Sequence, residues 1–364
     1  MIPFSVDASG ALRMVFRAFL KSLFGLFVLF CTMQLGAQEA THRMVFWNVE
    51  NYFDTRNDSV VNDDTFTPKG MNRWSRKRFE QKRNNIFKTL MAVASYDRAA
   101  DTIPLSSLMP LLVGLCEVEN AYVLDELCRA TPLRQFDYDY LHFDSPDRRG
   151  VDCALLYRKA LFSPFLVQPL FVSDTASLSD DRFTTRDILL VGGRLPGGDS
   201  LFVFVNHWPS KLAGAASAKR RMRVAAMLRS AMEDLCLRFP SATMVVMGDF
   251  NAEPSDLPVS QGLGFGNDSV NGLDFVNLTA CRQFGMSYKY RDQWSAIDQL
   301  MVRIPDASRA VVGPFGVARI GFLLVDDERY MGVKPHRTFS GYRYLGGFSD
   351  HLPVYVDIVL PSVD

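Results

Sequence analysis

The amino-acid sequence predicts an α/β domain with mixed β-sheets. Short apolar segments alternate with longer amphipathic stretches, and several short segments are rich in Val and Leu on both faces, which is typical of strands buried between layers. The composition agrees with a folded protein, because 48% of the 364 residues are hydrophobic and 40 basic residues balance 40 acidic ones. A disordered chain would combine low hydrophobicity with high net charge, so that class is excluded.

Eight apolar runs are predicted to form strands, and many of them end in polar or acidic residues. They are residues 44–49, 111–116, 153–157, 188–191, 201–205, 243–247, 299–302 and 354–360. Apolar residues at helical spacing predict helices over 73–93, 121–128 and 217–236. The long polar or Gly-rich loops at 174–185 and 254–271 are of a kind that often frames a site. No linker or repeat divides residues 42–361, so one domain is expected there.

The first 37 residues have the composition of a secretory signal peptide. Arg13, Arg17 and Lys21 precede a short apolar run, and Ala37 supplies a small residue for cleavage. The apolar run is shorter than the roughly 20 residues that a membrane span needs, although an uncleaved anchor is the alternative. Removing this segment takes three basic residues and one acidic residue, so the exported chain would carry a net charge of about −2. We therefore expect a secreted, periplasmic or cell-surface protein.

The cysteines after this segment indicate core thiols and not a metal site. They are Cys116, Cys128, Cys153, Cys236 and Cys281. Neither a CxxC pair nor clustered Cys/His spacing occurs, which argues against structural zinc. Their odd number leaves at least one free thiol unless an intermolecular bond forms, and most of them lie in apolar surroundings where buried thiols are common.

Acidic and amide side chains collect where the predicted strands end. Asn48 lies in the first strand near its end, and Glu117 follows the strand at 111–116 directly. A carboxylate at the end of an apolar strand is costly unless it is solvated, paired or bound to a cation. Glu117 is therefore a candidate ligand for a hard metal such as Mg²⁺, and an exposed strand-end acid is the alternative.

Three further strand ends carry residues suited to acid–base chemistry. Asp249 and Asn251 lie two residues apart, so they share a face if the strand continues, and together they can hold and aim one water molecule. Asp298 directly precedes the strand at 299–302. Asp350 and His351 precede the last strand and could supply a metal-facing carboxylate beside a titratable imidazole.

Two other features have a structural as well as a functional interpretation. His207 follows the strand at 201–205, and a lone histidine in such a place is more often structural than catalytic. A basic stretch occupies one predicted helix and is interpreted as a solvated helix face, not as a nucleic-acid patch. It comprises Arg73, Arg76, Lys77, Arg78, Lys82, Arg83 and Lys88.

Taken in order, these segments resemble the endonuclease/exonuclease/phosphatase superfamily. The matching segments are WNVEN at 47–51, LCEVEN at 115–120, NHWPSK at 206–211, GDFNAEP at 248–254, IDQL at 297–300 and SDHLPV at 349–354. The superfamily includes pancreatic-type DNases, abasic-site endonucleases, inositol polyphosphate 5-phosphatases and neutral sphingomyelinases. The resemblance spans residues 43–360 and implies a DNase I-like four-layer α/β/β/α sandwich of two packed mixed sheets, with metal-dependent phosphoester hydrolysis at one rim.

The resemblance also implies a metal side of the site. Glu117 is implied as the principal Mg²⁺ ligand, with Mn²⁺ as an alternative ion, and Asn48 and Asp350 lie close to the metal or to the scissile phosphate. Arg186, in Thr185-Arg186-Asp187, fits the place of the phosphate-contacting arginine. Arg337 is a further candidate for substrate contact.

The remaining implied roles concern proton transfer. Asp249 orients or deprotonates the attacking water, and Asn251 holds the phosphate or that water. His351, oriented by Asp298, stabilises the charged transition state or acts as an acid, and His207 faces the phosphate from the other side. These roles suit phosphodiester hydrolysis, which places charge on the non-bridging and leaving oxygens. Asp152 is a weaker candidate for orienting His207.

One departure from the family pattern bears on the substrate. In the DNase branch a basic residue commonly follows the metal glutamate by two positions and enters the minor groove, whereas here Glu119 stands there. An acid at that point would repel a phosphate backbone, which weakens the case for tight duplex binding. We expect a monomeric enzyme acting on a phosphoester, first a nuclease-like endonuclease on nucleic acid. The alternatives are a phosphatase or sphingomyelinase-like diesterase on a lipid or inositol phosphate, and a non-catalytic binding protein.

Overall fold

A computed structural model describes residues 40–98, 103–171, 185–211, 214–265, 273–281, 283–306 and 310–360. The predicted signal peptide at 1–37 and most of the predicted loop at 174–185 lie outside the described residues. None of the described helices combines the length and apolar character that crossing a membrane requires.

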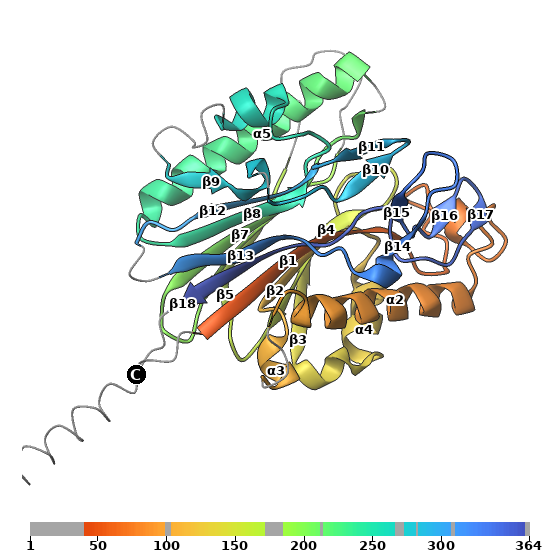
Figure 1. Ribbon diagram of the computed structural model, residues 1–364, viewed down its shortest axis with the longest axis horizontal. Coiled ribbons are helices and arrows are strands. Elements are labelled where there is room, and N and C mark those ends of the chain that lie inside the picture. The colour runs from red at the N-terminus through yellow and green to blue at the C-terminus, as the bar shows by residue number, and fades with distance from the viewer. Residues whose placement is uncertain are drawn as a thin grey trace, which may run out of the picture. The chain divides into compact units, whose positions relative to one another are not determined.

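Residues 41–360 form one compact unit built on two six-stranded sheets (Figure 1). The first sheet contains β13 (Val311–Val317), β18 (Val354–Leu360), β1 (Ala40–Tyr52), β2 (Leu112–Val118), β4 (Asp152–Arg158) and β3 (Tyr138–His142), in that spatial order. The second contains β5 (Ser163–Leu170), β6 (Ile188–Arg194), β7 (Ser200–His207), β8 (Thr243–Asp249), β12 (Asp298–Arg303) and β9 (Phe275–Asn277). Each sheet combines a parallel pair, β1 with β2 or β7 with β8, with antiparallel pairs, so the predicted mixed sheets are confirmed.

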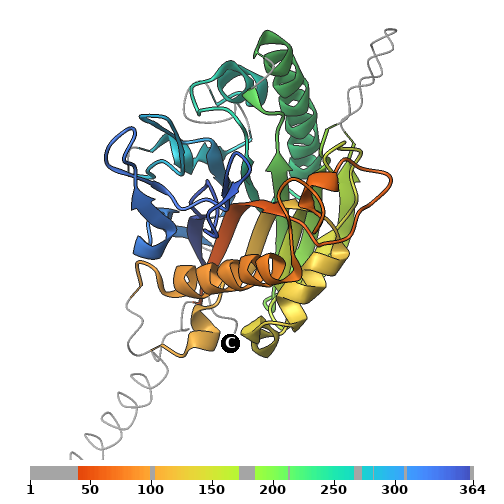
Figure 2. The same cartoon turned by 90° about the vertical axis from the view of Figure 1, so that its right-hand side faces the viewer.

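Helices cover the outer faces of both sheets, which gives the predicted α/β/β/α layers (Figure 2). Helices α2 (Arg76–Ser95) and α4 (Ala121–Arg129) pack on the first sheet, and α5 (Gly214–Arg238) packs on the second. Apolar side chains three or four residues apart form the buried stripe of each long helix, as in Ile86, Leu90 and Val93 of α2. Burial of these stripes supplies most of the helices' stability.

Short elements complete the rim where the sheets end. They are α3 (Leu105–Leu108), β10 (Tyr288–Tyr290), β11 (Gln293–Ser295), β14 (Leu324–Asp326), β15 (Val333–Pro335), β16 (Phe339–Ser340), β17 (Arg343–Tyr344), the π-helix η5 (Pro258–Leu263) and the 3₁₀ turns at Asp64–Phe66, Pro132–Phe136, Leu278–Ala280 and Gly321–Leu323. The sequence predicted none of these, nor β3, β5, β9 and β13. Most of them bury few residues, so their apolar pattern is weak.

The two sheets approach each other closely at Gly114. A Cβ atom at this position of β2 would lie 2.6 Å from Sδ of Met247 on β8, well inside van der Waals contact. Glycine therefore allows the two sheets to meet just below the strand ends that carry Glu117 and Asp249.

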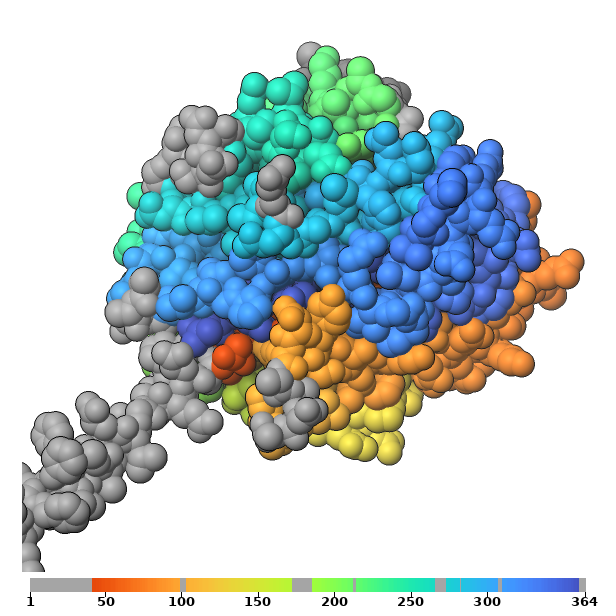
Figure 3. Space-filling model, in the orientation of Figure 1, coloured from red at the N-terminus to blue at the C-terminus, as the bar shows by residue number. Residues whose placement is uncertain are grey.

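The interpretation of the basic stretch as a solvated helix face is wrong for Lys82. Its side chain is fully buried, and Nζ donates hydrogen bonds to Oγ1 of Thr338 and to the carbonyl of Phe348, both at 2.6 Å. Lys82 thus ties α2 to the segment that precedes Asp350, and Figure 3 shows that segment (blue) lying beside α2 (orange). The cysteines agree with the sequence analysis, since Cys116, Cys128 and Cys153 are buried and all five described thiols are free.

A buried ion pair fastens β1 to β18. Nε and Nη2 of Arg43 each donate to one carboxylate oxygen of Asp357 at 2.8 Å, and both side chains are almost completely inaccessible. Arg98 contacts the same carboxylate at 2.6 Å, while Arg43 also donates to the carbonyl of Val93 at the end of α2. Asp357 therefore holds two strands and the end of a helix together.

We predict that Asp357→Ala lowers the free energy of unfolding by about 3–5 kcal/mol, because it leaves the Arg43 charge buried and unpaired. Urea unfolding followed by circular dichroism measures this loss. The control is Asp234→Ala, which breaks an exposed pair with Arg238 and should cost about 0–1 kcal/mol. Equal losses in the two variants would contradict the assignment.

Candidate active site

The register of the second sheet places three predicted site residues in one row. The parallel pairing of β7 with β8 sets His207 opposite Asp249, and the antiparallel pairing of β12 with β8 sets Asp298 opposite Asp249. All three side chains are buried. The row is thus fixed by backbone hydrogen bonding between strands whose sequence separation exceeds 40 residues.

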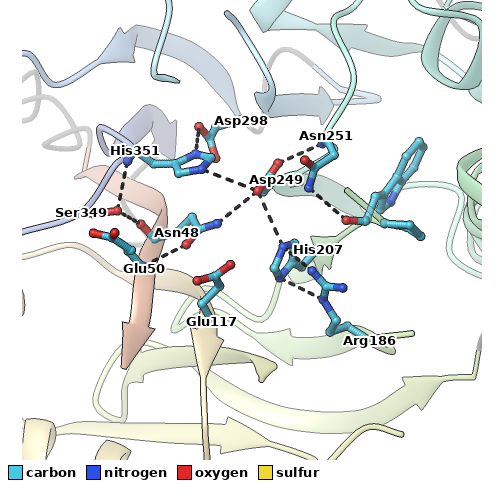
Figure 4. A network of polar contacts seen from close by, with 12 residues as sticks. Asn48, Glu50, Glu117, Arg186, His207, Asp249, Asn251, Asp298, Ser349 and His351 are labelled. Atoms are coloured by element: carbon cyan, nitrogen blue, oxygen red, sulfur yellow. Dashed lines mark hydrogen bonds and ion pairs between the residues drawn. The ribbon is translucent and has the colours of Figure 1, made fainter. Parts of the chain in front are cut away.

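Asp249 lies at the centre of a polar network that joins both sheets (Figure 4). One carboxylate oxygen accepts a hydrogen bond from Nδ2 of Asn48 at 3.1 Å, and the other accepts from the backbone N–H of Asn251 at 2.9 Å. The Nε2 atoms of His207 and His351 lie 3.7 and 3.9 Å from Oδ2. Burial raises the pKa of Asp249 to about 7, with Asp298 acting in the same direction and His351 against it.

Asp298 and the first sheet orient His351. Nδ1 of the imidazole lies 2.7 Å from Oδ2 of Asp298, whose other oxygen is buried without a hydrogen-bond partner. The backbone of His351 is held by the Ser349 hydroxyl at 3.0 Å and by the Trp47 indole N–H at 2.9 Å. Burial opposes the charged imidazole, but the adjacent Asp298 outweighs it and raises the pKa of His351 to about 10.

His207 contacts a positively charged neighbour, whereas His351 contacts a negatively charged one. Nε of Arg186 donates to Nδ1 at 3.2 Å, and Nη2 of Arg186 lies 2.7 Å from Nε2. Burial and the Arg186 charge together lower the pKa of His207 well below 6.5, so this imidazole is neutral. The suggestion that Asp152 orients His207 is wrong, because Asp152 instead contacts Nε2 of His142 at 3.2 Å.

Glu117 reaches the site through a left-handed backbone turn at the end of β2. Its φ angle is 62°, and the pairing of β2 with both neighbours is irregular at this point. One carboxylate oxygen accepts from the Asn51 N–H at 2.9 Å, and the other lies 3.2 Å from Nη2 of Arg149. Burial would favour the neutral acid, but Arg149 and Arg186 hold the pKa of Glu117 below its ordinary value.

Two further acidic side chains, Glu50 and Asp350, lie at the edge of the site and share Arg337 as a partner. Nη2 of Arg337 is 3.0 Å from the carboxylate of Asp350 and 3.3 Å from that of Glu50. The side chain of Arg337 is 43% exposed, so one part of the guanidinium still faces solvent. Burial and the Asp350 charge raise the pKa of Glu50 to about 7. Glu50 and Arg149 were not predicted from the sequence. Glu50 directly follows the predicted strand at 44–49, the signal used for Glu117, whereas Arg149 lies in the turn before β4 and has no such signal.

Besides the group formed by His142, Asp144 and Asp152, two sets of described side chains at this site could hold a metal ion. Asp249, Asp298 and His351 offer ligand atoms within 4.8 Å of one another. His351, however, is hydrogen-bonded to Asp298, and a protonated imidazole has no lone pair for a metal. Glu117 is ionised, and Glu117, the Asn48 amide and the Asp350 carboxylate carry oxygen donors of the kind that Mg²⁺ prefers, so the chemistry of this predicted set suits the ion.

The structure changes the interpretation of Glu119 as a residue that repels nucleic acid. Its side chain points away from solvent, and its carboxylate accepts from the Asp54 N–H at 2.6 Å. Burial, followed by the nearby Asp54 and Asp63, raises the pKa of Glu119 to about 8. The expected repulsion of a phosphate backbone by this residue is therefore wrong, because a buried carboxyl does not present a charge to a ligand.

Known structures share this fold at low sequence identity. The catalytic domain of human nocturnin with bound sulfate is 13% identical, with a TM-score of 0.53, covering 89% of this chain and 96% of that one. The mannosyl-6-phosphatase of Bacteroides thetaiotaomicron is 17% identical with a TM-score of 0.54, covering 88% and 100%. TDP2 from D. rerio, complexed with a single-strand DNA product, is 15% identical with a TM-score of 0.52, covering 88% and 99%. No curated protein sequence matches the chain.

The family model described as Endonuclease/Exonuclease/phosphatase family matches residues 43–359. This range includes both sheets, the covering helices and every residue of the row centred on Asp249. The chain therefore belongs to the endonuclease/exonuclease/phosphatase family.

Proposed function

We propose that this protein is a metal-dependent hydrolase that cleaves a phosphoester with an activated water molecule. The observation that carries the proposal is the buried Asp249 carboxylate, which has an imidazole on either side at 3.7 and 3.9 Å. Asp249 with its two neighbouring imidazoles offers a proton acceptor and two groups that can stabilise or protonate phosphoryl oxygens within one small volume.

The side chains around Asp249 have separate roles in this proposal. The Asp249 carboxylate orients the water and accepts its proton, because its pKa of about 7 suits a base at neutral pH. The Asn251 side-chain amide is directed by the carbonyl of Trp208 at 3.0 Å and holds the water or a phosphoryl oxygen. Glu117, Asn48 and Asp350 would hold Mg²⁺, which when bound would neutralise charge on the phosphate.

The two histidines have different roles, because they differ in charge. His351 is positively charged and lies beside Asp249, so it can stabilise negative charge on the phosphoryl group or donate a proton to the leaving oxygen. His207 is neutral and can only offer a hydrogen bond, while the charge on its side of the site comes from Arg186. The site therefore presents two cationic groups around the place where negative charge develops.

Within this class we propose a phosphodiester substrate and a nuclease-like activity, with lipid or inositol phosphates as the alternative. The experiment is hydrolysis of single- and double-stranded DNA, RNA, sphingomyelin, a phosphoinositide and bis-p-nitrophenyl phosphate, each with and without EDTA. Preferred cleavage of a nucleic acid supports the nuclease-like proposal, and preferred cleavage of a phosphomonoester replaces it. No turnover on any substrate at saturating Mg²⁺ or Mn²⁺ would indicate a non-catalytic binding protein.

We predict that EDTA abolishes activity, and that Mg²⁺ or Mn²⁺ restores it. Glu117→Gln should raise the Mg²⁺ concentration for half-maximal activity by about tenfold or more, because the variant loses an anionic ligand. Initial rates over a Mg²⁺ titration measure this shift. Activity that survives exhaustive chelation would contradict the metal dependence.

We predict that Asp249→Asn lowers kcat by a factor of about 10²–10⁴ without unfolding the protein, because the amide keeps the shape but cannot accept a proton. Steady-state kinetics on bis-p-nitrophenyl phosphate measure the loss. The matched control is Asp292→Asn, which removes the same charge from an exposed turn and should keep full activity. A fully active Asp249→Asn enzyme would refute the assigned base.

A further inference from the structure

One aromatic side chain, that of Tyr288, covers His351 at the rim of the active site. The centroids of the two rings lie 4.7 Å apart, and the ring planes are tilted by 35°. Tyr288 belongs to β10, and an isolated antiparallel bridge pairs its backbone with that of His351. An aromatic face attracts a cation that lies within about 6 Å of its centroid. The ring therefore supports the charged imidazole that the adjacent Asp298 favours.

The segment that carries Tyr288 is tied to the histidine and to its acidic partner. The carbonyl of Ser287 accepts from the Leu352 N–H at 2.8 Å. The fully buried hydroxyl of Ser287 donates to Oδ2 of Asp298, the same oxygen that contacts His351. The framework that orients His351 therefore also positions Tyr288.

The phenol group of Tyr288 is half-buried, and its O–H forms no hydrogen bond with any residue that the structure describes. Burial and then the charge of Asp350 raise the pKa of Tyr288 to about 12, with Arg337 acting against them and Asp249 adding a smaller contribution. The phenol thus lies near both Asp350 and Asp249, and a tyrosine keeps its proton at neutral pH. A free O–H donor is therefore available beside the proposed metal ligand and the proposed base.

We propose that Tyr288 contacts the substrate, and that its O–H donates a hydrogen bond to a non-bridging oxygen of the phosphoryl group. This inference rests on the proposed phosphoesterase activity and adds a neutral donor to the cationic groups of the site. The leaving oxygen departs opposite the attacking water, so proximity to Asp249 favours a non-bridging oxygen as the acceptor. A donor that is fixed in advance at this place stabilises the charge of the transition state.

The experiment separates the hydroxyl of Tyr288 from its ring. Tyr288→Phe keeps the ring and removes the O–H, whereas Tyr288→Leu removes both. Steady-state kinetics are measured at saturating Mg²⁺ on bis-p-nitrophenyl phosphate and on diphenyl phosphate, whose leaving group is less acidic. Tm and the ¹⁵N signals of His351 report whether the fold and the imidazole charge are retained. The matched control is Tyr342→Phe, which removes the O–H of an exposed phenol between β16 and β17.

We expect Tyr288→Phe to lower kcat by about 10- to 100-fold on both diesters, because the lost hydrogen bond is strongest in the transition state. Its KM, its Tm and the His351 signals should stay nearly unchanged. Tyr288→Leu should lose at least as much activity, and loss of the ring should also lower the pKa of His351. Tyr342→Phe should stay fully active.

Three results would overturn the proposal while leaving the phosphoesterase activity intact. The first is full activity of Tyr288→Phe. The second is a loss confined to diphenyl phosphate, because the O–H would then act on the leaving oxygen. The third is a loss accompanied by a lower Tm or a neutral His351, because Tyr288 would then only position that imidazole. Wild-type protein without turnover on any phosphoester would instead contradict the proposed function, and this inference with it.

Discussion

The hydrogen bond between Asn48 and Asp249 is the contact on which the site depends. Asn48 belongs to the first sheet and Asp249 to the second, so this 3.1 Å bond joins the two halves of the fold where their strands end. The close approach at Gly114 makes the bond geometrically feasible, and the Arg43–Asp357 pair stabilises the first sheet behind it. Packing of the sheets thus brings the two halves of the site together, the proposed metal ligands of the first sheet and the Asp249 row of the second.

The neighbours of each titratable group explain why chemically identical side chains behave differently. His351 and His207 are both buried and both lie near Asp249, but one contacts a carboxylate and the other a guanidinium. Opposite neighbours therefore give one cationic and one neutral imidazole on the two sides of Asp249. Similarly, Glu117 is ionised beside Arg149, whereas Glu119 is surrounded by other acids.

The sequence predicted the buried parts of the fold more completely than its rim. All eight predicted strands and three predicted helices exist, with boundaries that moved by a few residues, because buried elements impose a clear apolar pattern. The short hairpins near Lys289 and Lys334 bury little and have no such pattern.

The polar strand ends also indicated Glu117, Asp249 and His351. The resemblance to the family implied the contact between Asp298 and His351, which the structure contains. The partner of His207 was not predictable, as the error over Asp152 shows, because that contact depends on the packing of segments far apart in sequence. The burial of Lys82 was missed for a similar reason, since its partners Thr338 and Phe348 lie more than 250 residues away.

The two buried imidazoles on either side of Asp249, those of His207 and His351, differ in protonation state. The most direct measurement is ¹⁵N NMR of metal-free protein with labelled histidine, recorded near pH 7.5, with His207→Gln and His351→Gln assigning the signals. We expect His351 to carry protons on both ring nitrogens and His207 to give the signals of a neutral ring. Two neutral rings, or a charged His207, would refute this assignment of protonation states.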